Sequence, residues 1–126
     1  MQIIIINPEI VFPDHNRTTK DLERIAKEDK LIEIKPLPAG FRLPEKRGLL
    51  SSYEYILIDG NHRRNAAAIH SAHYPLCIIE DISDICIHPG LRNSLWKYFE
   101  TNEEIEETKQ AMIREALKRD VNSPNY

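Results

Sequence analysis

The stretch YILIDGNHRRNAAAIH, residues 55–70, decides the fold of this chain, because in it an apolar strand leads directly into a helix. Its first four residues are apolar, and three of them are aromatic or β-branched, which is typical of a strand. Asp59 and Gly60 form a common turn pair, and Asn61 is an ordinary cap for a helix that we expect to end near Ala72. A strand joined so closely to a helix indicates an α/β or α+β domain.

Further strands are expected on both sides of this stretch. Short apolar or alternating segments predict strands at residues 2–6, 31–37 and 75–80. Residues 38–52 are rich in proline and glycine and predict an exposed loop. Residues 81–90 fit either a short strand or a turn. Together these segments predict a small mixed sheet.

Helices are expected where apolar residues recur at helical spacing. This pattern predicts helices at residues 18–29, with Thr18 as the cap, at 91–99 and at 101–120. The last of these has acids in its first turn and bases in its last, as the helix dipole favours. Its narrow apolar stripe predicts that it either docks along one seam or pairs with another chain as a homodimer. The stripe consists of Ile105, Met112, Ile113, Ala116 and Leu117.

Length and composition place the chain among ordinary globular proteins. It has 126 residues, of which 41% are hydrophobic and 29% charged, which suits one domain with its own core. The formal net charge of −3 argues against a general electrostatic grip on DNA or RNA, although a local basic site stays open. The apolar run at residues 3–6 is too short for a signal peptide or a membrane span. We therefore expect a cytoplasmic protein with Cys77 and Cys86 reduced.

The turn after the central strand has the residue types of a phosphate site. A helix N-terminus offers backbone N–H groups and the positive end of the helix dipole, which suit an anion. Gly60 permits close approach of a ligand, and Arg63 and Arg64 add charged donors. The alternative is a structural turn in which Asn61 caps the helix and both arginines are solvated. Spacing alone leaves these two interpretations open.

Two further residues of the turn suggest chemistry beyond anion binding. Asp59 would repel a phosphate, unless it binds Mg²⁺ between itself and the phosphates or takes a proton from a hydroxyl nucleophile. His62 can donate to a phosphate oxygen or act as a general acid, because its ordinary pKa lies near neutrality.

The order of strand, Asp-Gly-Asn-His-Arg and alanine-rich helix resembles the ParB/sulfiredoxin superfamily, over about residues 1–82. The resemblance implies a ParB/sulfiredoxin-like domain followed by a helical extension, residues 83–126, packed on it. Members of this superfamily bind nucleotides with the loop and helix that carry the motif. The residues implied in binding here are Gly60, Asn61, His62, Arg63 and Arg64.

Within the superfamily the motif is most similar to that of the free serine kinases, Asp-Gly-His-His-Arg, from which only Asn61 departs. That resemblance implies that Asp59 activates a hydroxyl or binds metal, and that His62 and Arg63 contact phosphates. Sulfiredoxins place their repair cysteine at the position of Asn61, so we do not expect the repair reaction. The glutamate that the kinases use in the early loop has no secure match, although Asp14 and His15 lie in that region.

These observations predict a domain that binds ATP, ADP or CTP with Mg²⁺, with phosphoryl transfer to a small-molecule acceptor or nucleotide hydrolysis as its reaction. The alternative is a non-catalytic ParB-like module of a DNA-maintenance or mobile-element system, in which DNA or a nuclease is the partner.

Overall fold

The computed structural model describes residues 1–44, 46–92 and 99–119. Five strands form one mixed sheet in the order β1-β5-β3-β4-β2. The strands are β1 (Gln2–Ile6), β2 (Val11–Phe12), β3 (Ala39–Arg42), β4 (Tyr55–Asp59) and β5 (Tyr74–Ile78). The β1–β5 and β3–β4 pairs are antiparallel, whereas β3–β5 and β2–β4 are parallel. The expected α+β class with a small mixed sheet is confirmed.

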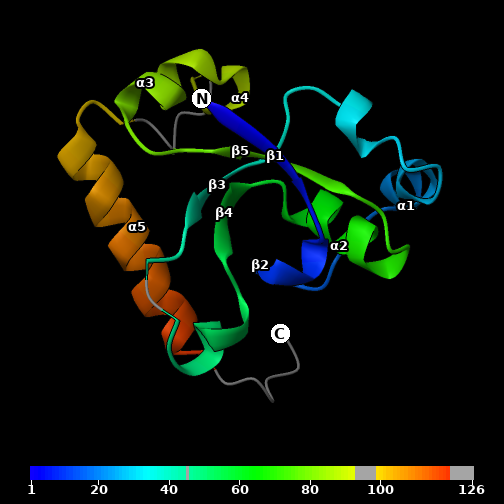
Figure 1. Ribbon diagram of the computed structural model, residues 1–126, viewed down its shortest axis with the longest axis horizontal. Helices are drawn as coiled ribbons and strands as arrows, with labels where there is room; N and C mark the ends of the chain where they lie inside the picture. The colour runs from blue at the N-terminus through cyan, green and yellow to red at the C-terminus, as the bar shows by residue number, and fades with distance from the viewer. Residues whose placement is uncertain (45, 93–98, 120–126) are drawn as a thin grey trace.

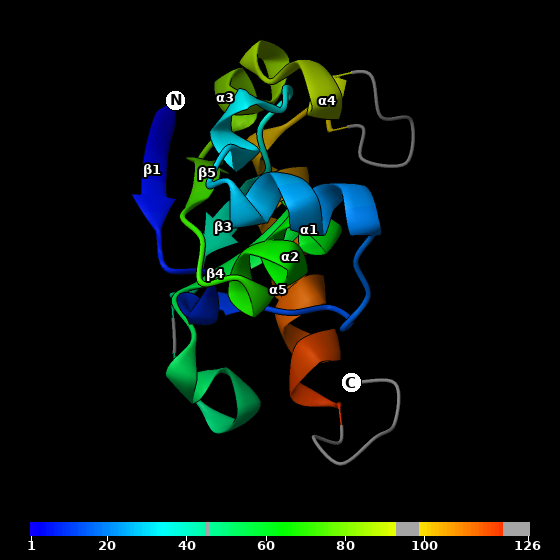
Figure 2. The same ribbon diagram turned by 90° about the vertical axis from the view of Figure 1, so that its right-hand side faces the viewer.

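Helices cover both faces of the sheet (Figures 1 and 2). One face packs against α1 (Lys20–Lys27) and α2 (Asn61–Ile69). The other packs against α3 (Ile82–Ile87), α4 (Pro89–Arg92) and α5 (Asn102–Leu117). Strand β4 contributes to both cores because its side chains alternate between the faces. Tyr55 belongs to the α1–α2 core, whereas Ile56 and Ile58 belong to the α5 core.

The apolar stripe of α5 docks on this chain's own sheet. Ile105, Ile113 and Ala116 are buried in the same cluster as Phe12 and Ile56. Thr101 caps the helix, since its hydroxyl accepts from the backbone N–H of Glu104 at 3.2 Å. The intramolecular seam was one of the two roles expected for the stripe, and pairing with a second chain stays a prediction.

The prediction of a strand at residues 31–37 is wrong. Leu31–Glu33 forms a short 3₁₀ helix, and Leu31 and Leu37 are buried whereas Ile32 is exposed. Apolar residues at positions 31, 34 and 37 recur every three residues, which matches the repeat of a 3₁₀ turn better than the alternation of a strand.

The prediction of a loop at residues 38–52 is wrong in part, because this segment contains the central strand β3 and a 3₁₀ helix at Gly48–Ser52. Gly40 lies inside β3 for a steric reason. A Cβ at this position would stand 2.6 Å from the carbonyl oxygen of Ile56 on β4. The glycine that suggested a turn therefore allows a close approach of two strands.

Smaller differences concern helix ends. The cap of α1 is Thr19, not Thr18, because the Thr19 hydroxyl accepts from the N–H of Leu22. Residues 82–87 form a helix rather than a strand or turn, and Asp81 and Asp84 cap it reciprocally. Of the helix expected at 91–99, α4 covers the start, and residues 93–98 lie outside the described part of the chain.

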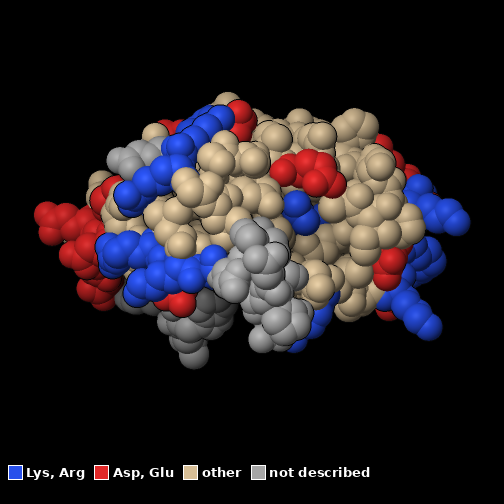
Figure 3. Space-filling model, turned by 90° about the horizontal axis from the view of Figure 1, so that it is seen from below, with Lys and Arg blue, Asp and Glu red and all other residues tan. Residues whose placement is uncertain are grey.

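Two surface properties bear on possible partners. The face seen from below carries acidic and basic side chains close to one another (Figure 3). Within the described residues, no helix has the length and apolar character needed to cross a membrane.

Candidate functional site

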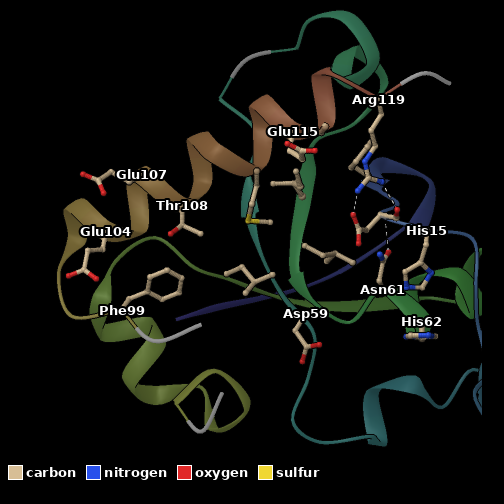
Figure 4. A pocket seen from close by; sticks show the side chains of 17 residues that line it. His15, Asp59, Asn61, His62, Phe99, Glu104, Glu107, Thr108, Glu115 and Arg119 are labelled. Atoms are coloured by element: carbon tan, nitrogen blue, oxygen red, sulfur yellow. Dashed lines mark hydrogen bonds and ion pairs between the residues drawn. The ribbon is translucent and has the colours of Figure 1, made fainter. Parts of the chain in front are cut away.

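A cavity of about 670 Å³ lies between α5, strand β4 and the start of α2 (Figure 4). Its apolar lining comes from the sheet, from α5 and from the segment before α5, and includes Phe12, Ile56, Ile58, Phe99 and Met112. Its polar lining comes from three parts of the chain. These residues are Asp14 and His15; Asp59, Asn61 and His62; and Glu104, Glu107, Thr108, Glu115 and Arg119.

The start of α2 opens onto this cavity. Gly60, which precedes the first turn, has φ +113°, a conformation that side chains other than glycine rarely adopt. No side chain hydrogen bond caps this helix start. The Tyr74 hydroxyl donates to the Gly60 carbonyl oxygen at 2.8 Å and so fixes the turn from the opposite side. Backbone N–H groups in the first turn of a helix have no partner within the helix, and they suit an anion.

The early loop, residues 13–19, is held against α2 by hydrogen bonds. The Asn65 amide donates to the carbonyl oxygens of His15 and Arg17, both at 2.8 Å. Thr18 donates to the carbonyl oxygen of His62 at 3.0 Å. The side-chain oxygen of Asn61 accepts from the backbone N–H of Asp14 at 3.2 Å. These contacts place Asp14 and His15 at the cavity, where the sequence suggested but did not fix a role for them.

Two imidazole rings stand together at this end of the cavity. The ring centroids of His15 and His62 are 4.6 Å apart. His15 Nδ1 accepts from the backbone N–H of Arg17 at 3.0 Å, so the neutral ring carries its proton on Nε2. Burial lowers the pKa of His15, and the nearby charges of His62 and Arg17 lower it further. The neutral ring of His15 is therefore suited to donate a hydrogen bond from Nε2.

The two arginines of the motif are not among the residues that line the cavity. Arg64 is buried, and its Nε donates to the carbonyl oxygens of Pro8 and Val11 at 3.1 and 3.0 Å. Arg63 donates to the Pro36 carbonyl oxygen at 2.6 Å. These bonds join α2 to distant segments of the chain. A phosphate-binding role for either arginine stays a prediction, and in this structure their guanidinium groups have other partners.

Asp59 lies at the cavity with a half-exposed carboxylate, 3.9 Å from the Arg63 guanidinium. In the described ranges, no group of three or more His, Cys, Asp or Glu side chains is arranged to hold a metal ion. Mg²⁺ is commonly bound by one or two carboxylates together with water and substrate phosphates. Asp59 therefore fits an ion that arrives with a nucleotide better than a resident metal centre.

The contribution of α5 to the cavity lining was not predicted from the sequence. Glu104, Thr108, Met112, Glu115 and Arg119 line the cavity and follow one another at intervals of three or four residues. Within α5, that spacing places Glu104, Thr108, Met112 and Glu115 on one face of the helix, where Met112 is shared with the apolar stripe. Arg119 follows just beyond the helix end. The second stripe was visible in the sequence, but nothing there indicated that this face borders the motif.

No protein-family model and no curated protein matches this sequence. Among solved structures, the chain is similar to the crystal structure of the C-terminally truncated chromosome-partitioning protein ParB from Caulobacter crescentus complexed with CTP-γ-S. The identity is 18% and the TM-score 0.42, over 95% of this chain and 67% of that chain. A similarity at this level carries no argument about function.

Proposed function

We propose that the cavity binds a nucleotide with Mg²⁺ and that the start of α2 holds its phosphates. The observation that carries this proposal is the start of α2, whose first two residues, Asn61 and His62, line a cavity large enough for a nucleotide. Asn61 and His62 line the cavity beside the open turn and supply further donors.

The two ends of the cavity suit the two ends of a nucleotide. Asn61, His62 and His15 lie at one end, and Phe99, Glu104 and Thr108 lie at the other (Figure 4). An aromatic ring with neighbouring hydrogen-bonding groups suits a base, which needs an apolar surface and polar partners at its edge. We therefore place the phosphates at α2 and the base near the first turns of α5.

The charge of the cavity makes Mg²⁺ part of the proposal. Five carboxylates line it, from Asp14, Asp59, Glu104, Glu107 and Glu115, against one arginine. A bare phosphate chain is repelled by such a lining, whereas a Mg²⁺ complex carries less negative charge and offers the metal to a carboxylate. Asp59 is the carboxylate closest in sequence to the open helix start, so we assign the metal contact to it.

The same residues can support phosphoryl transfer or hydrolysis. In this scheme the attacking hydroxyl or water gives its proton to Asp59 as its oxygen bonds to the terminal phosphorus, and His62 donates to a phosphate oxygen. The bond from that phosphorus to the bridging oxygen breaks, and the shortened nucleotide leaves with that oxygen. Magnesium supplies charge neutralisation of the phosphates when it is bound. The acceptor hydroxyl belongs to a small molecule for transfer and to water for hydrolysis.

The alternative, a DNA-contacting module without turnover, draws no support from charge. The chain has a net charge of −3, and on the face in Figure 3 the groups of basic side chains have acidic side chains beside them.

Calorimetric titration with ATP, ADP and CTP, each with and without Mg²⁺, tests the nucleotide proposal. We expect binding that requires Mg²⁺, and a loss of about tenfold or more in affinity in Asp59→Asn and in His62→Ala. Asp21→Asn is the matched control, because Asp21 is an exposed acid on α1 outside the cavity lining. Absence of binding by all three nucleotides at millimolar concentration contradicts the proposal. Phosphorus NMR of the bound mixture, with and without serine, then separates binding from hydrolysis and transfer.

A further inference from the structure

We propose that Arg119, just beyond the end of α5, is the guanidinium that binds the phosphates, and that Asp14 holds it until the ligand replaces that carboxylate. This inference rests on the proposed nucleotide function and extends it, because it assigns the cationic ligand to the C-terminal helix and not to the motif.

The first observation is the position of Arg119. It is the only Lys or Arg among the described residues that line the cavity. Its guanidinium donates to both the backbone carbonyl oxygen and the carboxylate of Asp14, and it lies 5.8 Å from the centroid of the Phe12 ring. Figure 4 shows the side chain reaching from α5 toward Asn61 and His15.

The second observation is that these contacts continue to the start of α2. The backbone N–H of Asp14, whose carbonyl oxygen accepts from Arg119, donates to the side chain of Asn61, the first residue of α2. The positive charge of Arg119 also contributes to lowering the pKa of His15, which places it near that ring. A guanidinium in this position borders the site that we assign to the phosphates.

The third observation is that both motif arginines already serve backbone carbonyls. The buried Arg64 donates to the carbonyl oxygens of Pro8 and Val11, and Arg63 donates to that of Pro36. Releasing Arg64 would leave buried carbonyl oxygens without their donor, which is unfavourable. Arg119 also donates to a backbone carbonyl oxygen, that of Asp14, but Asp14 is exposed, so water can replace this donor.

The ion pair between Arg119 and Asp14 is suited to replacement by contacts with a ligand. The Asp14 side chain is 66% exposed and that of Arg119 29% exposed, and ion pairs this accessible to water contribute little to stability. A Mg²⁺ complex of a phosphate chain offers each partner a stronger contact. The guanidinium gains bidentate phosphate oxygens, and the carboxylate gains the cation.

Inorganic tripolyphosphate, titrated with and without Mg²⁺, tests this exchange without a base. We expect Arg119→Ala to weaken binding of the Mg²⁺ complex by about tenfold or more, and Arg119→Lys to recover part of the loss. Arg114→Ala, an exposed arginine of α5 outside the cavity lining, should bind as the wild type does. Asp14→Asn should tighten binding of metal-free tripolyphosphate, because the competing carboxylate is gone.

A purely structural role of the Arg119–Asp14 pair predicts a different pattern of binding. If Asp14 and Arg119 only fasten α5 to the early loop, both variants should weaken binding, and Asp14→Asn should not tighten it. Unchanged binding of the Mg²⁺ complex in Arg119→Ala, or no gain of metal-free binding in Asp14→Asn, overturns the inference. A wild type that binds neither tripolyphosphate nor nucleotide instead overturns the proposed function.

Discussion

Gly60 sets the geometry of the candidate site more than any charged residue of the motif does. Its φ of +113° turns the chain from β4 into α2. A Cβ there would stand 2.5 Å from Pro38 Cβ and 2.7 Å from the Tyr74 hydroxyl oxygen. Both neighbours are packed, so neither can move aside without disturbing the hydrogen bond of Tyr74 to this turn.

Gly60→Ala should therefore lower the free energy of unfolding by at least about 1–3 kcal/mol, from backbone strain alone. Gly48→Ala is the matched control. Gly48 also has positive φ, but its nearest neighbour would be the Leu117 side chain at 3.4 Å, so only the left-handed strain of about 1–2 kcal/mol applies. Urea unfolding of both variants measures the difference. Equal destabilisation would show that the space around Gly60 is not restrictive.

The sequence indicated which residues gather at the turn but not where each side chain points. Asp59, Asn61 and His62 reach the cavity because they lie at a strand end and in the first turn of a helix, positions that local pattern predicts. The direction of Arg64 depends on carbonyl oxygens of Pro8 and Val11, more than fifty residues earlier in the chain. No local pattern encodes such a partner.

Among the elements, α5 has two roles that lie on adjacent faces. Its apolar stripe packs on the sheet, and its polar stripe forms one wall of the cavity. A helix that served only as an appendage would not need its second stripe to border the motif. Docking of the apolar stripe is therefore a condition for the site.

Ile113→Ala should lower the free energy of unfolding by about 2–5 kcal/mol, because Ile113 is buried in the core shared by α5 and the sheet. Its neighbour Arg114 is exposed, and Arg114→Ala should change stability by no more than about 0.5 kcal/mol. Chemical denaturation followed by circular dichroism measures both. A small effect of Ile113→Ala would mean that α5 is not firmly packed on this sheet.

The elements that sequence reasoning placed wrongly share a physical cause. Strand β3 is short and lies between β4 and β5. It has glycine at position 40 because β4 packs too closely there for a Cβ atom. In Leu31–Glu33 and the residues after it, Leu31 and Leu37 are buried and Ile34 is half-buried, so every third side chain faces the core. In both segments tertiary contacts decide the backbone, and the local signals of glycine, proline and alternation favour something else.

At the scale of the whole molecule, the cavity joins segments from both ends of the chain. The early loop, the β4–α2 turn and α5 meet on one side of the sheet, with Asp14 bonded to Arg119 although the two are 105 residues apart. Alternating strands and helices were enough to predict the fold class. The cavity depends on how α5 crosses the sheet, which periodicity does not specify.

The most direct test of the central claim is to locate the bound ligand by ¹⁵N NMR during titration with the Mg²⁺ complex of ATP or CTP. We expect the largest shifts at the backbone amides of Gly60, Asn61, His62 and Arg63, with smaller ones along the cavity face of α5. Shifts concentrated instead at the small cavity of Ile5, Asp29, Ile32 and His73, with the α2 amides unchanged, would contradict a phosphate site at this helix start.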